Sequence, residues 1–598
     1  MSAPQPDQPQ LQPRLISNET GARAQLQVVP PLGDDTAPTE EIPSPFRSAP
    51  PVVTLLRDES TAHPVALAIA AAWSCYAARP AKVTNVVKLI YGPTPPDLSP
   101  AAAADRHGRR DRALKLYADL FAAGHHTTLQ HATFVFVLDN VSRLALWSFF
   151  HSHPFYNSEQ VSQRYREVSG DSMTAPDLPS DAAAVYDAAI ERSLAGYRRL
   201  TELLTPDMEA RYAGIFPARA RAKGDAAVKR LESAVQKRAQ EVARYVLPLA
   251  TPAHLYHTVN ALTLLRYHIL ANQPDAPLEV RYIVNRMIAE VLALDPYFLG
   301  APGYRLDLRV LTTAETLEAD ALDHWRVTMA QTPDSAEAFC QRFDAALGER
   351  DSRLVATNPD AEAVMAEAVR AVLGADAVTL PDAAAIAQVL DGAHNPYHGQ
   401  AVFLGMHSKL MQTMNHVPFT FQKRISGAED AQNQRHRGTP ASRPLLTAHL
   451  RRDPDVIVPW AVRQNPEALA EYHATIQAMW DAKNALLDLG VSPEIALYLL
   501  PNAHRVRFYE SGTLLSYYWK WVKRLCYDAQ REIFDTAVQE VAQVREALPT
   551  IGAYVDGPPC VMRSRSGATP VCPEGERFCG IPVWRGYTFE ELTPRRVM

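Results

Sequence analysis

The chain has 598 residues, of which 47% are hydrophobic, and it carries a formal net charge of −6 at pH 7. A chain of this length is too long to fold around one ordinary hydrophobic core, and its apolar fraction is high enough to form the cores of two globular domains. The net acidity argues against a general nucleic-acid-binding protein, and no uncharged apolar run is long enough to span a membrane. The N-terminus lacks the apolar core of a secretory signal, and six cysteines in so long a chain form no disulfide framework, so a cytoplasmic location is expected.

The beginning of the chain is predicted to be disordered. Prolines crowd residues 1–50, which show no sustained hydrophobic period and cannot bury enough surface to offset the entropy of ordering. A short β-rich run follows at 52–56, and small apolar residues then predict a helix over 64–78.

A motif-bearing region comes next. A helix over 111–123 is expected to end at Gly124, the residue type favoured after a helix C-terminus. The alternating run 131–138 predicts a strand with Phe134 and Phe136 on one face. Residues 142–150 predict a further helix, which leads to the end of this region.

In residues 181–250 the apolar side chains recur with the period of an α-helix and charged residues stand between them, so this region is predicted to be mostly helical. The basic stretch 219–238 has interleaved acids, so a solvated helix face is favoured over a binding patch.

The second half of the chain echoes the first. HVPFTF at 416–421 resembles HATFVF at 131–136, and the pattern that begins near Arg353 matches the opening strand and helix of the first half. Two further pairs are ARYVLP at 243–248 with ALYLLP at 496–501, and APLEVR at 276–281 with AQREIF at 529–534. Pro248 precedes Ala276 by 28 residues, and Pro501 precedes Ala529 by the same 28, so the chain is interpreted as two copies of one unit.

The motifs in both copies resemble the flavin-dependent thymidylate synthases, whose signature is G-H-x-T-x-x-E-H, an apolar strand, and then Q-x-x-R-H-R-x-x-S-x-N-E-x-S-x-R-Y. Copy one keeps Gly124-His125, His131 and, at the end, Ser162, Arg164 and Tyr165, but has Ser152-His153-Pro154 in place of R-H-R. Counting back from Tyr165 puts Gln160 at the glutamate position.

Copy two keeps the other half of the signature. It has Gln432 and Arg435-His436-Arg437, and then Gly438-Thr439-Pro440 without the S-x-R-Y ending. The losses in the two copies are therefore complementary. A symmetric dimer has two equivalent composite sites, but a fused chain needs to keep only one of them, so each copy can lose the half that the other site used.

The resemblance implies an α+β protein with two tandem domains, each an antiparallel sheet flanked by helices, packed as an internal pseudo-dimer. The expected boundaries are residues 51–300 for copy one, 301–345 for a bridging segment, 346–555 for copy two and 556–598 for a cysteine-containing tail.

The activity that the resemblance implies is reductive methylation of dUMP to dTMP. Methylenetetrahydrofolate would donate the carbon, and NADPH would reduce bound FAD. The partners would be dUMP and the folate, with no nucleic acid and no membrane, and the fused chain is expected to form a homodimer. No protein nucleophile is implied, because the family activates the uracil without a cysteine.

The family motifs assign residues to these roles. Arginine suits the anionic ligands because its planar fork stays charged and binds phosphate in a bidentate manner. The catalytic residues implied are His125 and Arg281. The implied substrate-binding residues are Gln432 and Arg435 from copy two and Gln160, Ser162, Gln163 and Arg164 from copy one. The implied cofactor-binding residues are Arg435, His436, Arg437 and Asn260.

Several departures from the family keep a pseudoenzyme or binding paralogue open as an alternative, as well as another flavin or nucleotide enzyme on the same scaffold. The segments 243–248, 260–262 and 276–281 resemble three further family motifs, A-R-x-x-L-P, N-A-R and A-Q-x-E-I-R. Leu262 and, in copy two, Leu515 stand where the N-A-R motif has arginine, and Phe534 replaces the counterpart of Arg281. In copy one, Pro277 replaces a glutamine, Asn157 replaces a serine, and Gln160 lacks the glutamate charge.

Structural interpretations of the same residues also remain. His125, His126 and His131 are compatible with core histidines, and Arg281 with an ion pair to Glu279. Cys560, Cys572 and Cys579 lack paired C-x-x-C spacing and are a weak zinc signal, so no metal is predicted.

Overall fold

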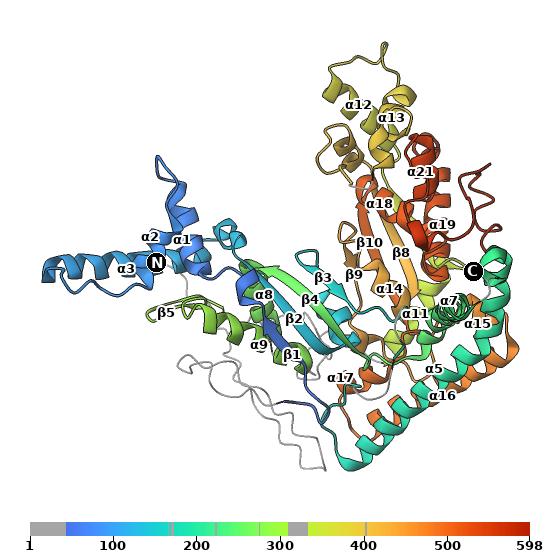
Figure 1. Ribbon diagram of the computed structural model, residues 1–598, viewed down its shortest axis with the longest axis horizontal. Helices are drawn as coiled ribbons and strands as arrows, with labels where there is room; N and C mark the ends of the chain where they lie inside the picture. The colour runs from blue at the N-terminus through green and yellow to red at the C-terminus, as the bar shows by residue number, and fades with distance from the viewer. Residues whose placement is uncertain are drawn as a thin grey trace, which may run out of the picture.

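The computed structural model describes residues 44–164, 167–168, 173–221, 224–273, 276–308, 333–400 and 403–597. Two four-stranded antiparallel sheets have the same strand order, β1-β2-β4-β3 and β7-β8-β10-β9. In Figure 1 each sheet with its helices forms one arm of the molecule, and the arms meet near α17. The predicted α+β fold with two tandem copies is confirmed.

The first sheet contains β1 (Val52–Leu55), β2 (Thr133–Ser142), β3 (Asn157–Gln160) and β4 (Pro252–Asn260). In β2 the apolar residues alternate, so that Phe134, Phe136 and Leu138 all point to one face and are fully buried. The predicted strand and its shared aromatic face are therefore confirmed. Helices α8 (Ala261–Ala271) and α9 (Leu278–Leu294) follow the sheet.

The second sheet contains β7 (Ser352–Thr357), β8 (Pro418–Ser426), β9 (Ala441–Ser442) and β10 (Arg505–Thr513). Helices α18 (Leu514–Arg524) and α19 (Arg531–Ala547) follow it and have the same lengths as α8 and α9, 11 and 17 residues. Because the strands match in order and these helices match in length, the duplication extends well beyond the motifs.

The helices near the first motif follow the sequence expectations with three differences, one of which is that the first helix ends at residue 74 and not 78. Helix α1 is Pro64–Ser74, and α3 is Pro100–Ala122, which begins earlier than expected because Ser99 caps it. Gly124 has a φ of +77°, and the amide of His125 donates to the carbonyl of Leu120, so the predicted glycine cap is present. The expected helix over 142–150 is α4 (Arg143–Ala145) followed by a π-helical turn, η3 (Leu146–Phe150), a conformation that accommodates an extra residue.

Long helices join the two copies. In Figure 1, α5 (Ser180–Ile215) and α16 (Pro466–Asp488) run side by side, with α7 (Asp225–Ala243) near one end. At Gly196 a side chain would collide with Thr475, so the close approach of α5 to α16 requires glycine there. Tyr186 and Tyr472 are fully buried in the shared core that these helices form.

The remaining elements are short or peripheral. They are α2 (Val83–Ile90), β5 (Gly300–Ala301), β6 (Tyr304–Arg305), α6 (Pro217–Ala220), α12 (Ala361–Leu373), α13 (Asp382–Leu390), α14 (Gly427–Asn433), α15 (Trp460–Arg463), α17 (Pro493–Ala496), α20 (Pro549–Gly552) and α21 (Pro559–Arg565). No helix in the described ranges is both long and apolar enough to cross a membrane.

Two expected boundaries change. Residues 1–43 lie outside the described residues, but residues 44–50 are ordered, because Phe46 is buried and bridges to Pro176. The bridging segment was expected to end at residue 345, yet α11 (Pro333–Leu347) crosses this position and Asp344 pairs with Arg507 of β10 at 2.8 Å. The end of the bridge therefore belongs structurally to copy two.

The copies meet where their matching motifs cross. Pro248 and Pro501 form an antiparallel bridge, and the amides of Leu249 and Asn502 each donate to the other copy, to Leu500 and Leu247, both at 2.8 Å. The expected internal pseudo-dimer is thus held by reciprocal backbone hydrogen bonds.

A reciprocal side-chain network surrounds this crossing. Glu279 accepts from the amide and hydroxyl of Ser142 in its own copy and from the hydroxyl of Tyr498 in the other, at 2.7, 2.5 and 2.7 Å. Glu532 does the same with Ser426 and with Tyr245 of copy one. Glu279, the acid named as an alternative ion-pair partner for Arg281, is instead buried and serves this network.

We predict that Tyr498→Phe lowers the free energy of unfolding by about 1–3 kcal/mol, because it leaves a buried carboxylate oxygen without one of its donors. Urea denaturation followed by circular dichroism measures this change. Tyr256→Phe is the matched control, since Tyr256 is 57% exposed on β4. Equal midpoints for the two variants would contradict the stabilising role of the network.

Candidate functional site

A cavity of about 460 Å³ lies where the two copies face each other. Copy one lines it with η3, β3 and the loop that follows β3, and copy two lines it with α14 and the loop between α18 and α19. The lining residues with ionisable or amide side chains are Arg143, His151, Glu159, Gln160, Gln163, Arg164, Arg244, Gln432, Gln434, Arg435, His436, Asn502, His504, Lys523, Arg524, Cys526, Asp528, Glu574 and Arg577. A volume of this size is typical of a small-molecule site.

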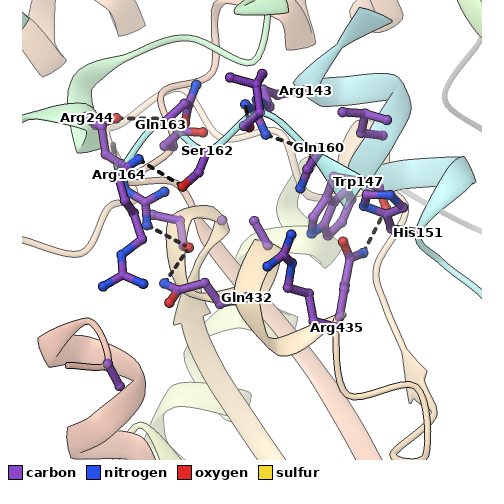
Figure 2. A pocket seen from close by; sticks show the side chains of 18 of the residues that line it. Arg143, Trp147, His151, Gln160, Ser162, Gln163, Arg164, Arg244, Gln432 and Arg435 are labelled. Atoms are coloured by element: carbon purple, nitrogen blue, oxygen red, sulfur yellow. Dashed lines mark hydrogen bonds between the residues drawn. The ribbon is translucent and has the colours of Figure 1, made fainter. Parts of the chain in front are cut away.

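All six residues predicted to bind substrate line this one cavity. In Figure 2, Gln160, Ser162, Gln163 and Arg164 follow one another along the copy-one loop, and Gln432 and Arg435 approach from copy two. The structure therefore brings the two halves of the motif together, while the binding roles of these residues stay predictions.

Local structure explains this placement. β3 pairs with the edge of β4 as far as Gln160, and the amide of Val161 donates to His254 at 3.0 Å, so the next residues run along the end of the sheet. On the other side, the Ser426 hydroxyl caps α14 by accepting from the backbone amide of Glu429 at 3.0 Å. Gln432 lies one turn after Ala428 on this short helix and faces the cavity.

Each predicted side chain is held by neighbours. Gln160 accepts from Arg143 at 3.0 Å. Arg164 donates to the carbonyl of Asp528 at 2.8 Å and forms an ion pair with Glu241 at 2.5 Å. Gln432 donates to the side-chain oxygen of Gln530. These contacts fix the polar wall before any ligand is present.

The turn that contains Arg435, His436 and Arg437 is fixed from behind by Glu510. This buried carboxylate accepts from Asn433 at 2.9 Å and from Thr439 at 3.1 Å, one on each side of the turn. Burial alone would raise the pKa of Glu510, but the buried ammonium groups of Lys423 and Lys520 hold that pKa well below its usual range. Glu510 therefore remains charged and can keep both contacts.

The cavity is strongly electropositive. Burial first, and then Arg244 and Arg435, lower the pKa of Arg143 to about 9. Burial, followed by Arg164 and Arg435, lowers the pKa of Arg524 to about 10. Because the cations repel one another, a bound anion would relieve this repulsion.

Several buried polar atoms of the wall make no hydrogen bond among the described residues. The donors are Nε of Arg143, Nε of Arg244 and Nε2 of Gln163, and Oε1 of Gln432 is an acceptor. His504 donates through Nδ1 to the carbonyl of Pro501 at 2.8 Å, which leaves its Nε2 as a second acceptor. Buried polar groups are normally paired, so the cavity is equipped for a ligand with both an anionic group and hydrogen-bond donors.

Four residues predicted as catalytic or cofactor-binding do not line this cavity, and their roles stay predictions. His125 is held at the end of α3, and Arg281 is buried against its own copy, donating to the carbonyl of Gln273 at 2.7 Å. Asn260 uses its side chain to cap α8. Arg437 donates to Asn157 at 3.2 Å on the exposed side of the turn.

His436 does line the cavity, but its ring is engaged. Its Nε2 accepts from Nε of Arg524 at 2.8 Å. Tyr165, the last residue of the copy-one motif, lies outside the described residues.

Other cations of the wall were not predicted from the sequence. Arg244 belongs to the ARYVLP segment and Arg143 follows Ser142, so both stood next to recognised motifs but received no role. Lys523, Arg524 and Arg577 carry no motif signal. Only the packing of α18 and the C-terminal tail brings them to the cavity.

The cysteines of the tail gather near copy two. Cys526, Cys560, Cys572 and Cys579 line a small second cavity of about 20 Å³. Among the described residues, however, no group of three or more histidine, cysteine or acidic side chains is placed to hold a metal ion.

We predict that the ligand-free protein loses stability as the pH falls from 7 to 5. Burial, and then Arg143 and Arg435, lower the pKa of His151 to about 3. The unfolded imidazole takes up a proton near pH 6.5 while the folded one stays neutral, so this group alone costs about 2 kcal/mol at pH 5.

Denaturation of His151→Gln at both pH values checks this prediction, because the variant should lose about 2 kcal/mol less than the wild type between pH 7 and 5. The matched control is His131→Gln, a change at an exposed position. The same pH dependence in the His151 variant and the wild type would contradict the assignment.

Comparison with known proteins assigns this chain to a family. The family model described as thymidylate synthase complementing protein matches residues 58–297 and 353–550. A flavin-dependent thymidylate synthase of Clostridium tetani is 26% identical over 225 residues, which cover 37% of this chain and 81% of that protein. That of Geobacter sulfurreducens is 31% identical over 184 residues, which cover 30% of this chain and 75% of the relative.

Among solved structures, a UMP/dUMP methylase from Streptomyces cacaoi bound with 5-Br dUMP is 18% identical, covering 42% of this chain and 94% of that one. Its TM-score of 0.28 is too low to bear on the fold. The two family-model matches together span most of the chain and coincide with the two sheets and their helices. The chain therefore belongs to the thymidylate synthase complementing protein family, and it contains two tandem copies of the family's domain.

Proposed function

We propose that the chain is an FAD-dependent, thymidylate synthase-like enzyme that methylates dUMP to dTMP at one composite site. The observation that carries this proposal is the convergence of Gln160, Ser162, Gln163 and Arg164 of copy one with Gln432 and Arg435 of copy two on one electropositive cavity. Family membership supplies the reaction class, and the relatives are named flavin-dependent thymidylate synthases.

The chemistry of the wall suits a pyrimidine mononucleotide. Arg164 and Arg244 offer guanidinium groups to the phosphate, and a guanidinium can bind phosphate through two parallel hydrogen bonds. The unpaired amide donor of Gln163 and the unpaired acceptor of Gln432 suit the carbonyl and N–H groups of a uracil edge. By holding phosphate and base at once, these residues would orient the nucleotide for reaction.

The state of the cavity's cysteine supports a reaction without a thiol nucleophile. Burial raises the pKa of Cys526, which lines the cavity, to about 12. The thiolate is the nucleophilic form of cysteine. Cys526 therefore stays protonated and unreactive at neutral pH.

The residues fit a mononucleotide better than they fit a dinucleotide flavin. Of the four residues predicted for the cofactor, Arg435 and His436 line the cavity, whereas Asn260 and Arg437 do not. In the proposed reaction, FAD reduced by NADPH would supply reducing equivalents and methylenetetrahydrofolate the carbon. A homodimer of the fused chain and a cytoplasmic location are part of the same proposal.

A binding protein without catalytic activity is the second candidate, and specific observations favour it. Phe534 stands at the copy-two position that corresponds to Arg281 and is fully buried, and Gln160 is neutral where the family has a glutamate. Leu262 and Leu515 are likewise buried at the two N-A-R positions. Another flavin or nucleotide enzyme on the same scaffold is a further alternative.

Two substitutions test the shared site. Arg164→Ala and Arg435→Ala should each weaken dUMP binding by about tenfold or more, since a hydrogen bond to a charged group contributes about 1.5–3 kcal/mol. Isothermal titration calorimetry measures the affinities, and Arg109→Ala on the exposed face of α3 is the control. If the two variants impaired the binding of different ligands, the single composite site would be refuted.

A visible spectrum and a flavin oxidation assay test the reaction. The proposed enzyme should purify yellow with bound FAD, and its reduced flavin should be oxidised only when dUMP and methylenetetrahydrofolate are both present, with dTMP as the product. A yellow protein that forms no dTMP would support the binding paralogue. A colourless protein that takes up no FAD but binds dUMP would support a nucleotide-binding protein without flavin.

A further inference from the structure

The C-terminal tail reaches the cavity although it lies outside the two stretches that match the family model. The second match ends at residue 550, whereas Glu574 and Arg577 both line the cavity, beside Cys526 and Asp528 of the loop between α18 and α19. The tail therefore contributes one acidic and one basic side chain that the family motifs do not predict.

The tail is firmly attached to copy two. Val583 and Leu592 are buried in the copy-two core, and the hydroxyl of Tyr527 donates to the carbonyl of Leu592 at 2.5 Å. On the other side, Arg211 of α5 donates to the carbonyl of Val597 at 3.0 Å. These contacts hold the tail across both copies and fix where residues 574–577 reach the cavity.

Arg596 of the tail lies next to Phe534, the copy-two residue that corresponds to Arg281 of copy one. In copy one, Arg281 donates to a carbonyl of the segment that leads into α9. In copy two, Phe534 stands at that position, and the guanidinium of Arg596 lies 4.4 Å from its ring centroid and donates to the carbonyl of Ala529 at 2.6 Å. Arg596 thus steadies the loop 526–529, whose Asp528 carbonyl accepts from Arg164.

Arg577, like Arg435 with Glu159, is largely exposed and lies 3.5 Å from a carboxylate, unlike the buried arginines of the wall. Arg143, Arg164 and Arg244 are engaged with Gln160, Glu241 and Gln530. The side chain of Arg577 is 70% exposed, and its guanidinium lies 3.5 Å from the carboxylate of Glu574. An ion pair so exposed contributes little free energy, so the guanidinium can exchange the carboxylate for a ligand anion at small cost.

We propose that Arg577 is a substrate-binding residue supplied by the tail, and that it contacts the phosphate of the mononucleotide in the composite cavity. This inference rests on the proposed dUMP site and adds a residue to it. Glu574 holds the guanidinium at the cavity when no ligand is bound and competes with the phosphate for it. Arg596 is a positioning residue, because it acts on the cavity only through the loop 526–529.

The test compares two ligands that differ only in the phosphate. Calorimetry with dUMP and with deoxyuridine is carried out on the full-length wild type, Arg577→Ala and the control Arg595→Ala, whose arginine pairs with Glu591 in the same tail and does not line the cavity. Arg577→Ala should raise the Kd for dUMP about tenfold, as expected for one charge-assisted contact, and leave the Kd for deoxyuridine unchanged. Arg595→Ala should change neither Kd.

A second variant tests the competition. Glu574→Gln should tighten dUMP binding by about twofold to fivefold, because it removes the carboxylate that pairs with Arg577.

The inference is overturned if Arg577→Ala binds dUMP like the wild type, or if it weakens the binding of dUMP and of deoxyuridine equally. If wild-type dUMP binding depends on Arg164 and Arg435 but not on Arg577, only this inference fails, whereas a wild type that binds no dUMP removes the proposed function as well.

Discussion

The architecture depends on one buried contact made twice, a glutamate that joins a serine of its own copy to a tyrosine of the other. Glu279 and Glu532 each begin this network on the helix that follows the sheet, and Tyr498 and Tyr245 each complete it from the other copy. Because Ser142 and Ser426 also start α4 and α14, the same contact sets the orientation of both copies and the starting point of the segments that face the cavity. A buried carboxylate is costly without donors, and each glutamate takes two donors from the serine of its own copy and one from the tyrosine of the other.

Symmetry at the crossing coexists with asymmetry at the cavity. The backbone bridge at Pro248 and Pro501 is reciprocal, yet the segment after Ser142 contains a π-helical turn where the segment after Ser426 continues as α14. On the copy-one side, Trp147 donates to Asp430 at 2.8 Å, and Asp430 also pairs with Arg443. The unpaired polar atoms of the cavity wall nevertheless come from both copies, from Arg143, Gln163 and Arg244 in copy one and from Gln432 and His504 in copy two.

Much of this arrangement could be predicted from the residues. The repeated strands, the glycine after α3 and the complementary motif halves are local features, and they indicated correctly which segments face each other. The roles of His125, Arg281 and Asn260 stay predictions, because a motif reports which residue type is present and not whether its side chain is used by its own domain. Arg281 donates to nearby carbonyls, and Asn260 caps a helix. The tail could not be predicted to reach the cavity, because its contacts join residues far apart in sequence and follow no period.

Covalent continuity changes how the cavity responds to concentration. In a dimer of separate chains, dilution would dissociate the surfaces that carry Arg164 and Arg435. Dimers that combine different subunits would also be possible. Here the loop from copy one and α14 from copy two belong to a single polypeptide, so their encounter is intramolecular and its effective concentration is set by the chain. The cavity should therefore assemble with the same geometry at any protein concentration, and each half can diverge without having to remain compatible with a copy of itself.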